Sequence, residues 1–63
     1  MIDKETCKKF IGKYVQIQQT FGNQPFFSNG IVQDVNDVVL IMEFKRRLQV
    51  YDLKRIDAIR EAE

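Results

Sequence analysis

Residues 26–42, which read FFSNGIVQDVNDVVLIM, decide the predicted fold. The pattern predicts a long strand over residues 26–35, and Gly30 inside it indicates a bulge or tight bend of the kind that curls a sheet into a barrel. Asn36-Asp37 is a candidate for a two-residue turn. Residues 38–42 are apolar on both faces, which is typical of a strand covered on two sides. The stretch therefore predicts a bent hairpin within a curved sheet.

The segment before this stretch predicts a helix and then a strand. Residues 1–12 are expected to form a short helix that Asp3 caps and Gly12 ends. From residue 13 onward the apolar period changes from helical to two, and residues 14–18 alternate as a first strand. A turn is expected over residues 20–25, where Gly, Asn and Pro interrupt the pattern.

Three consecutive cations follow the apolar strand. Lys45, Arg46 and Arg47 are predicted to reverse the chain, and residues 48–51 alternate again as a further strand. Cations that project together at a strand reversal suit contact with phosphate groups. They equally suit a solvated hairpin whose charges keep a sheet edge from pairing. The pattern by itself leaves both roles open.

The C-terminal segment fits two structures. Residues 51–63 have the apolar spacing of a helix capped by Asp52. Residues 52–55 also fit a tight turn, followed by a short strand at residues 56–59. The pattern does not decide between them.

Size and composition limit what can hold the fold together. The chain has 63 residues, 44% of them hydrophobic and 30% charged, which is the composition of one folded domain. So small a core usually needs a disulfide, a metal or partner subunits. Cys7 is the only cysteine and histidine is absent, so an internal disulfide is excluded and the usual metal ligands are missing. We therefore expect oligomerisation, with no metal and no cofactor.

The composition also argues against an enzyme. Histidine, the commonest general base, is absent, and no glycine-rich phosphate loop is present. Cys7 lies among lysines but has no partner base. Asp34 and Asp37 flank a turn, where carboxylates usually cap backbone amides. A binding protein is the better expectation, although a net charge of +1 implies no strong global attraction to nucleic acid.

The order of a helix, bent strands, a basic hairpin and a short last strand resembles the Sm-like (LSm) family, which includes the bacterial RNA chaperone Hfq. Residues 30–42 resemble the first Sm motif: a glycine in the second strand, apolar residues two and five positions later, an acidic or amide turn, and an apolar strand. Residues 12–15, Gly-Lys-Tyr-Val, resemble the start of the family's first strand. Residues 50–51 resemble the Val-Tyr pair of the second motif in Hfq. The resemblance covers nearly the whole chain.

This resemblance implies a single Sm-like domain over residues 1–63, with a helix over residues 1–12 and a strongly bent, five-stranded antiparallel barrel over residues 13–63. It also favours the turn and strand for the C-terminal segment. Subunits of the family join edge to edge, the fourth strand of one pairing with the fifth strand of the next, in rings of six or seven. The resemblance therefore implies the partner subunits that a small core needs.

The RNA-contact positions depart from the family pattern. Around the second turn, uridine-binding members of the family carry an aspartate, then a histidine or a similar residue, and then an asparagine. This chain has Asn36, Val38 and Leu40 at these three positions. In the second motif, Tyr51-Asp52 replaces an Arg-Gly pair. The expectation is RNA binding by a divergent site. Its members fall into three groups by role: phosphate contacts at the rim from Lys45, Arg46 and Arg47, charge near the pore from Lys54 and Arg55, and base contacts from Asn36 and Tyr51 with Asp37 beside them.

A second reading remains open. The near-neutral charge and the altered contact positions favour a small β-barrel used for protein interaction or assembly, without nucleic acid. Its partner surface would contain Val39, Ile41 and one of the two residues Phe26 and Phe27. Under both readings we expect a cytoplasmic protein, because no apolar run approaches the roughly 20 residues of a membrane span and no signal segment follows the N-terminus.

Overall fold

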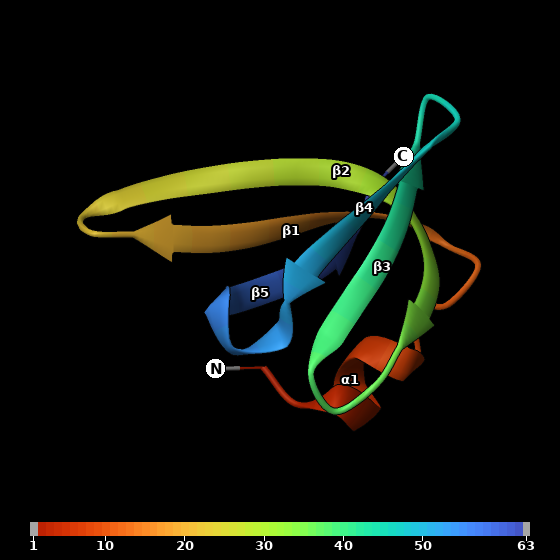
Figure 1. The fold of residues 1–63 in the computed structure, drawn as a ribbon, viewed down its shortest axis with the longest axis horizontal. Coiled ribbons are helices and arrows are strands. Elements are labelled where there is room, and N and C mark those ends of the chain that lie inside the picture. Colours follow the sequence, from red (N-terminus) through yellow and green to blue (C-terminus); the bar gives the residue numbers. More distant parts are fainter. Residues whose placement is uncertain (1, 63) are drawn as a thin grey trace.

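A computed structural model of the protein describes residues 2–62, and one antiparallel sheet of five strands dominates it (Figure 1). A short helix precedes the sheet, and a single 3₁₀ turn separates the last two strands. The elements run in the order α1 (Lys4–Lys8), β1 (Tyr14–Phe21), β2 (Gln24–Val35), β3 (Val39–Phe44), β4 (Arg47–Asp52), η1 (Leu53–Arg55) and β5 (Ile56–Glu61). The prediction of a mainly β fold with a short N-terminal helix is confirmed.

The helix begins where the sequence predicts and ends earlier. The Asp3 carboxylate accepts a hydrogen bond from the Thr6 N–H at 2.7 Å, which is the expected N-cap. The helix ends at Lys8, and the chain then passes through turns to Gly12, whose φ of +87° lies in the left-handed region. The predicted extent of residues 1–12 is therefore wrong at its C-terminal end, and residue 1 lies outside the described residues.

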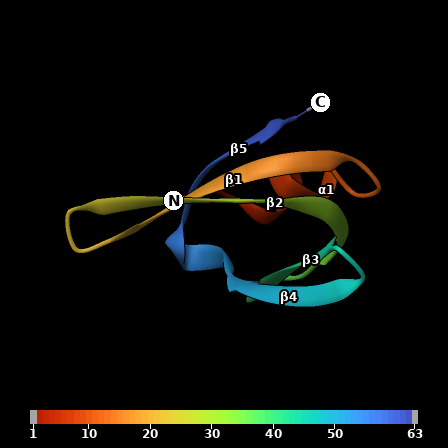
Figure 2. The same cartoon turned by 90° about the horizontal axis from the view of Figure 1, so that it is seen from above.

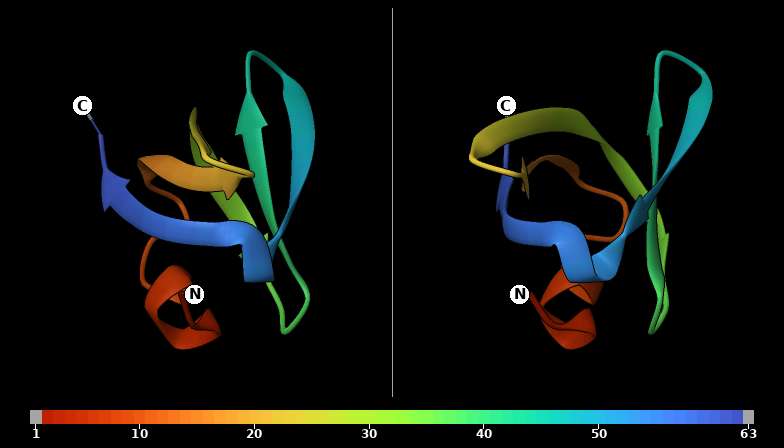
Figure 3. Two further views of the ribbon diagram at one scale, coloured as in Figure 1. Left: turned by 90° about the vertical axis from the view of Figure 1, so that its left-hand side faces the viewer. Right: turned by 60° about the vertical axis from the view of Figure 1, so that its left-hand side comes forward.

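The strand order in the sheet is β4-β3-β2-β1-β5, and β2 links its two halves. The first part of β2 pairs with β1, and its last residues, from Ile31 to Val35, pair with β3. Seen from above, β1 and β5 lie on one side of the molecule and β3 and β4 on the other (Figure 2). Figure 3 shows β2 curving from one side to the other. The curve of β2 therefore divides the sheet into two parts, β1 with β5 and β3 with β4.

Gly30 lies where β2 passes from β1 to β3, as its predicted role in a bend requires. A Cβ at this position would stand 2.8 Å from the Glu43 carbonyl oxygen and 3.3 Å from the Met42 Cβ. Only glycine allows β2 and β3 to approach this closely. The irregularity in the pairing of β2 with β3 falls a little later, between Val32 and Asp34.

The buried side chains come from alternate positions of the strands and form one cluster. We call the sheet face that carries them the inner face and the opposite one the outer face. The predicted inward residues Val15 and Ile17 are fully buried. In β3, Leu40 and Met42 are buried, whereas the outer face of that strand is only half-covered. The full cluster consists of Cys7, Val15, Ile17, Val32, Val35, Leu40, Met42, Leu53 and Ile56.

The turns are tighter than the sequence suggests. Gly22 and Asn23 alone connect β1 to β2, and Pro25 is accommodated inside the strand opposite Thr20. The C-terminal segment adopts the turn and the strand favoured by the resemblance, and β5 extends two residues beyond the predicted end, to Glu61. The helical alternative for this segment is wrong.

The sheet is not closed. Strands β4 and β5 are its outer strands, and within residues 2–62 each has one edge without a partner strand. No helix in this part of the chain is long and apolar enough to cross a membrane.

Candidate nucleic-acid interface

The predicted RNA-contact residues lie at both ends of the β3–β4 hairpin. Asn36 and Asp37 stand at the β2–β3 turn, close to η1, because the Leu53 N–H donates to the Val38 carbonyl at 2.9 Å. The basic residues 45–47 form the other end. At about 3.3 Å per residue, six-residue strands separate the two ends by roughly 15–20 Å. The predicted residues therefore do not form one cluster.

The β2–β3 turn uses its polar side chains to hold its own structure. The Asn36 Oδ1 accepts hydrogen bonds from the N–H groups of Val38 at 2.7 Å and Val39 at 2.9 Å. Asp37 forms an ion pair with Lys4 of α1 at 2.7 Å. The hydrogen bond with Lys4 and the positive charge of Lys4 lower the pKa of Asp37. The same hydrogen bond and the negative charge of Asp37 raise the pKa of Lys4. The oxygen of the Asn36 side chain is therefore occupied within the turn, and only its amide nitrogen is free to donate to a bound base.

The η1 cations stand between the turn and the β1–β2 hairpin. Asp52 accepts a hydrogen bond from the Lys54 N–H at 3.0 Å, which begins η1. The Arg55 guanidinium lies over the Phe21 ring, 5.3 Å from its centroid. Phe21 in turn packs edge-on against Phe26. Arg55 is thus directed to the aromatic end of the β1–β2 hairpin.

The basic hairpin tip has an unusual backbone. Lys45 and Arg46 are the two central residues of the turn that Phe44 and Arg47 close, and their φ angles are 53° and 66°. Two-residue hairpins with positive φ normally carry Asn-Gly, because side chains disfavour this region. Strain of this kind costs about 1–3 kcal/mol per residue and is concentrated at functional sites. The prediction that the three cations reverse the chain is confirmed.

A groove of about 720 Å³ lies behind this tip, between the first part of β2 and the hairpin. It brings Tyr51 together with two of the tip cations. The eight residues around it are Phe27, Ser28, Asn29, Phe44, Lys45, Arg47, Gln49 and Tyr51. The rings of Phe44 and Tyr51, two cations and several neutral hydrogen-bonding groups therefore share one hollow, whereas the Phe27 ring, opposite Gln18, points to the outer face of the sheet.

Register explains how the hairpin contributes to the groove. Cross-strand partners share a face, and Phe44 pairs with Arg47, Met42 with Gln49 and Leu40 with Tyr51. Because Leu40 and Met42 are buried, these partners all stand on the inner face. Sequence reasoning missed Phe44, Gln49 and Asn29 as site residues. Counting the two-residue turn between residues 44 and 47 would have placed Phe44 beside the predicted cations.

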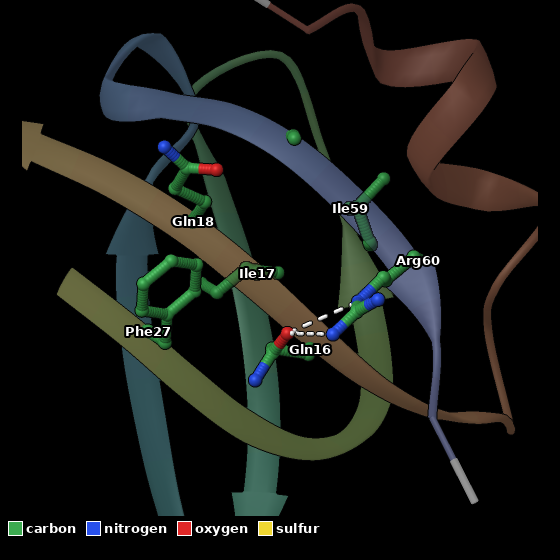
Figure 4. A pocket seen from close by; sticks show the side chains of 7 residues that line it. Gln16, Ile17, Gln18, Phe27, Ile59 and Arg60 are labelled. Atoms are coloured by element: carbon green, nitrogen blue, oxygen red, sulfur yellow. Dashed lines mark hydrogen bonds between the residues drawn. The ribbon is translucent and has the colours of Figure 1, made fainter. Parts of the chain in front are cut away.

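A second hollow, of about 240 Å³, opens on the other face of the sheet (Figure 4). The Arg60 guanidinium stands at its rim and donates through Nε and Nη2 to the Gln16 Oε1, at 3.1 Å and 2.8 Å. Phe27 lines this hollow as well as the groove. Ile17, Gln18, Ala58 and Ile59 complete it. Arg60 is therefore an ordered cation on the outermost strand of the sheet.

Cys7 and the carboxylates of residues 2–62 lie outside the groove. Cys7 is fully buried, and burial, together with the negative charge of Asp3, raises the pKa of its thiol. A buried neutral thiol is a poor nucleophile. Across residues 2–62, no three side chains of the types His, Cys, Asp and Glu stand close enough to hold a metal ion.

Comparisons with known proteins found no match for this chain among family models, curated proteins or solved structures.

Proposed function

We propose that this protein is an Sm-like subunit that binds single-stranded RNA in the groove between β2 and the β3–β4 hairpin. The observation that carries the proposal is the combination of the Phe44 and Tyr51 rings with Lys45 and Arg47 in one groove. Proteins that bind single strands pair cations, which follow the phosphates, with aromatic rings, on which bases stack. This groove contains both parts.

Each group in the groove has a separate role in the proposal. Phe44 is 40% exposed, so its ring is accessible to a base. Stacking of a base on such a ring is worth about 1–3 kcal/mol. Lys45 and Arg47 neutralise phosphates, and the Gln49 amide can donate to and accept from a base edge.

The Sm-like assignment rests on the resemblance and agrees with the chain order of the elements. A short helix, a second strand bent at a glycine, and a 3₁₀ turn before the last strand follow one another as the family's fold implies. In the proposal the bent sheet is the family's barrel. The unpaired edges of β4 and β5 are those through which family subunits join into rings of six or seven, and such pairing satisfies backbone groups that an isolated chain exposes.

One observation favours the alternative of a protein-interaction module. Leu48 and Val50, on the outer face of β4, are 66% and 63% exposed. Side chains of this size gathered on one strand are typical of a protein contact. The expected partner surface of Val39 and Ile41 is less suitable, because both are already half-buried.

Fluorescence anisotropy with labelled single-stranded RNA, measured over a range of salt concentrations, tests the proposal. Replacing Lys45, Arg46 and Arg47 by alanine should weaken binding and flatten its salt dependence by about 0.7 logarithmic units for each phosphate that is no longer neutralised. A triple change of Lys8, Lys9 and Lys13 to alanine is the control, because it removes the same charge elsewhere. Equal affinity and slope for all three proteins would reject RNA binding at the groove.

A second variant separates stacking from charge. Phe44→Leu keeps the net charge and removes an exposed ring on the face that lines the groove, so it should lower affinity by roughly 5- to 150-fold, the equivalent of 1–3 kcal/mol. The salt slope should stay the same. If the wild-type protein binds no RNA, the protein-interaction reading becomes the better one.

A further inference from the structure

Strand β2 loses its second neighbour where the β3–β4 hairpin turns away. Strand β3 pairs with β2 only over the residues from Ile31 to Val35. Two residues before Ile31, at Asn29, the residue that would continue this pairing is Lys45, which has already entered the hairpin turn. Figure 1 shows the β1–β2 hairpin extending away from β3 and β4. Within residues 2–62, the first part of β2 therefore has β1 on one side and no partner strand on the other.

Alternate residues of this part of β2 direct their backbone groups to opposite sides. The Val32 N–H donates to the Lys13 carbonyl at 3.1 Å, and the Val32 carbonyl accepts from the Gly12 N–H at 2.8 Å. The even-numbered residues of β2 therefore face β1, and the odd-numbered residues before Ile31 face the free edge. The groups on the free edge belong to Phe27 and Asn29.

These backbone groups point into the groove. Phe27 and Asn29 line the groove although their side chains, opposite Gln18 and Gln16, belong to the outer face. The part that they present to the groove is the edge of the strand, with one N–H and one C=O group each. Pro25 takes the next position on this edge and has no N–H, so the row ends there. A row of free N–H and C=O groups is a template for another extended backbone.

We propose that the groove binds an extended acidic peptide of a partner protein, which adds a short antiparallel strand to the free edge of β2. Peptides that add a strand gain affinity from main-chain hydrogen bonds and specificity from pockets for alternate side chains. The groove of about 720 Å³ has the size of an ordinary ligand site, roughly 300–1,000 Å³. The peptide is a second ligand for this groove, beyond the RNA of the proposed function, and the two exclude each other.

Charge determines which peptide fits. Ser28 stands opposite the buried Ile17, so its side of β2 is the inner face. The peptide residue opposite Ser28 projects to the same face, because directly opposed residues share a face, and its side chain enters the groove. The groove contains Lys45 and Arg47, and none of its eight lining residues is a carboxylate. An acidic side chain at this position therefore forms charge-assisted hydrogen bonds with these cations.

The exposed ring of Phe27 fits the same arrangement. Phe27 is 58% exposed on the outer face, and the peptide residue opposite it projects to that face as well. Pairs of an aromatic residue with a β-branched residue stabilise neighbouring strands. The peptide that fits best therefore alternates β-branched with acidic residues. The first part of β2 in a second copy is a poor occupant, because residues 14–33 contain no Asp or Glu.

Titration of the isotope-labelled protein with a synthetic peptide, followed by NMR of the backbone amides, tests the proposal. The probe is a peptide with capped ends in which three valines alternate with two glutamates. The Phe27 and Asn29 amides should shift on binding and exchange more slowly with solvent. The Ser28 amide is the internal control, because its N–H faces β1 with or without the peptide. Unperturbed Phe27 and Asn29 amides at saturating peptide would overturn the proposal.

Methylated peptides separate strand addition from simple attraction of charge. Methylation of the valine nitrogens, which face β2, removes hydrogen-bond donors and leaves the charge of the peptide unchanged. It should lower affinity by roughly 5- to 30-fold, the equivalent of about 1–2 kcal/mol. Methylation of the two glutamate nitrogens, which face away from β2, is the matched control and should leave the affinity unchanged. Equal affinities for both methylated peptides would refute strand addition.

Two protein variants test the preference for an acidic peptide. Arg47→Ala should weaken peptide binding, because Arg47 lines the groove. Arg46→Ala removes the same charge from the neighbouring position, which does not line the groove, and should leave the affinity unchanged. Equal affinities of the two variants would refute the role of the groove cations.

Competition distinguishes this proposal from the proposed function. The peptide should displace labelled RNA from the groove. A protein that binds RNA but not the peptide would keep the proposed function and overturn this inference. A protein that binds the peptide but no RNA would keep the inference and reject the proposed function.

Discussion

Replacing Gly30 by alanine tests the closest approach of the backbone in this fold. The new Cβ would meet the Glu43 carbonyl oxygen at 2.8 Å and the Met42 Cβ at 3.3 Å. The first of these atoms belongs to the backbone of β3 and cannot rotate away. Strands β2 and β3 must therefore separate locally, at the position where β2 bends.

The expected cost follows from two opposing effects. Overpacking of this kind typically destabilises a protein by about 1–3 kcal/mol. Alanine also restricts the unfolded chain, which offsets about 0.4–1 kcal/mol. The net loss is then roughly 1–2 kcal/mol, equivalent to a melting temperature lower by roughly 4–16 °C for a domain of this size.

Urea unfolding followed by circular dichroism measures this loss, at one fixed protein concentration because assembly raises apparent stability. The Gly30→Ala midpoint should fall while the slope stays constant. Ser28→Ala is the control, since Ser28 lies two residues earlier on the same face of β2 and its truncation adds no atom. A Gly30→Ala midpoint equal to or above that of the wild type would refute the reasoning, because the restricted unfolded chain would then be the only effect.

Three further predictions concern the two ends of the hairpin. Asn36→Ala should lower the free energy of unfolding by about 1–2 kcal/mol, because two turn amides lose their acceptor. Asn36→Asp keeps an acceptor oxygen and should retain most of this stability. The midpoints of urea unfolding of the two variants test both expectations. Replacing Lys45 and Arg46 by Asn and Gly should raise thermal stability through relief of the positive φ angles and should weaken RNA binding; a lower melting temperature would contradict the presence of strain at the tip. The ion pair of Lys4 with Asp37 should stabilise the fold at neutral pH. The lowered pKa of Asp37 means that this contribution is lost as the pH falls through that pKa, below 3.8, and the raised pKa of Lys4 means that it is also lost above pH 10.5. Asp37→Asn should flatten the acid limb of a stability–pH curve, and an unchanged limb would show that the pair contributes nothing.

The strands were largely predictable because their side chains alternate in the sequence. Val15 and Ile17 point inward as the period of two requires, and Gly30 lies at the bend. The helix was predicted too long because the apolar spacing continues through Phe10 and Ile11 after helical hydrogen bonding has ended. Phe10 still packs against the core from a turn, whereas Ile11 is 44% exposed. Periodicity identifies a buried face and not the backbone that presents it.

The candidate site was predictable only in part, and the reason is the range of the contacts. The basic tip is a local feature, so three adjacent cations were enough to locate it. The groove forms because β2 curves and brings Phe27 across to the hairpin, near Phe44 and Tyr51. No local sequence pattern predicts that these residues, which are far apart in the chain, lie close together. Asn36, by contrast, was predicted as a turn residue from the sequence, and its side chain accepts the hydrogen bonds of the turn amides.

Strand β4 links stability, assembly and binding in this small protein. Its inner face lines the groove, its outer face exposes Leu48 and Val50, and its edge is unpaired. If subunits join through the β4 edge, RNA that extends from the groove across this edge contacts two chains and favours the assembled state over the separate ones. Linkage is reciprocal, so assembly must then raise RNA affinity by the same factor by which RNA strengthens assembly. Two properties that the sequence suggested separately, a core in need of partner subunits and a cluster of cations, would be coupled through one strand.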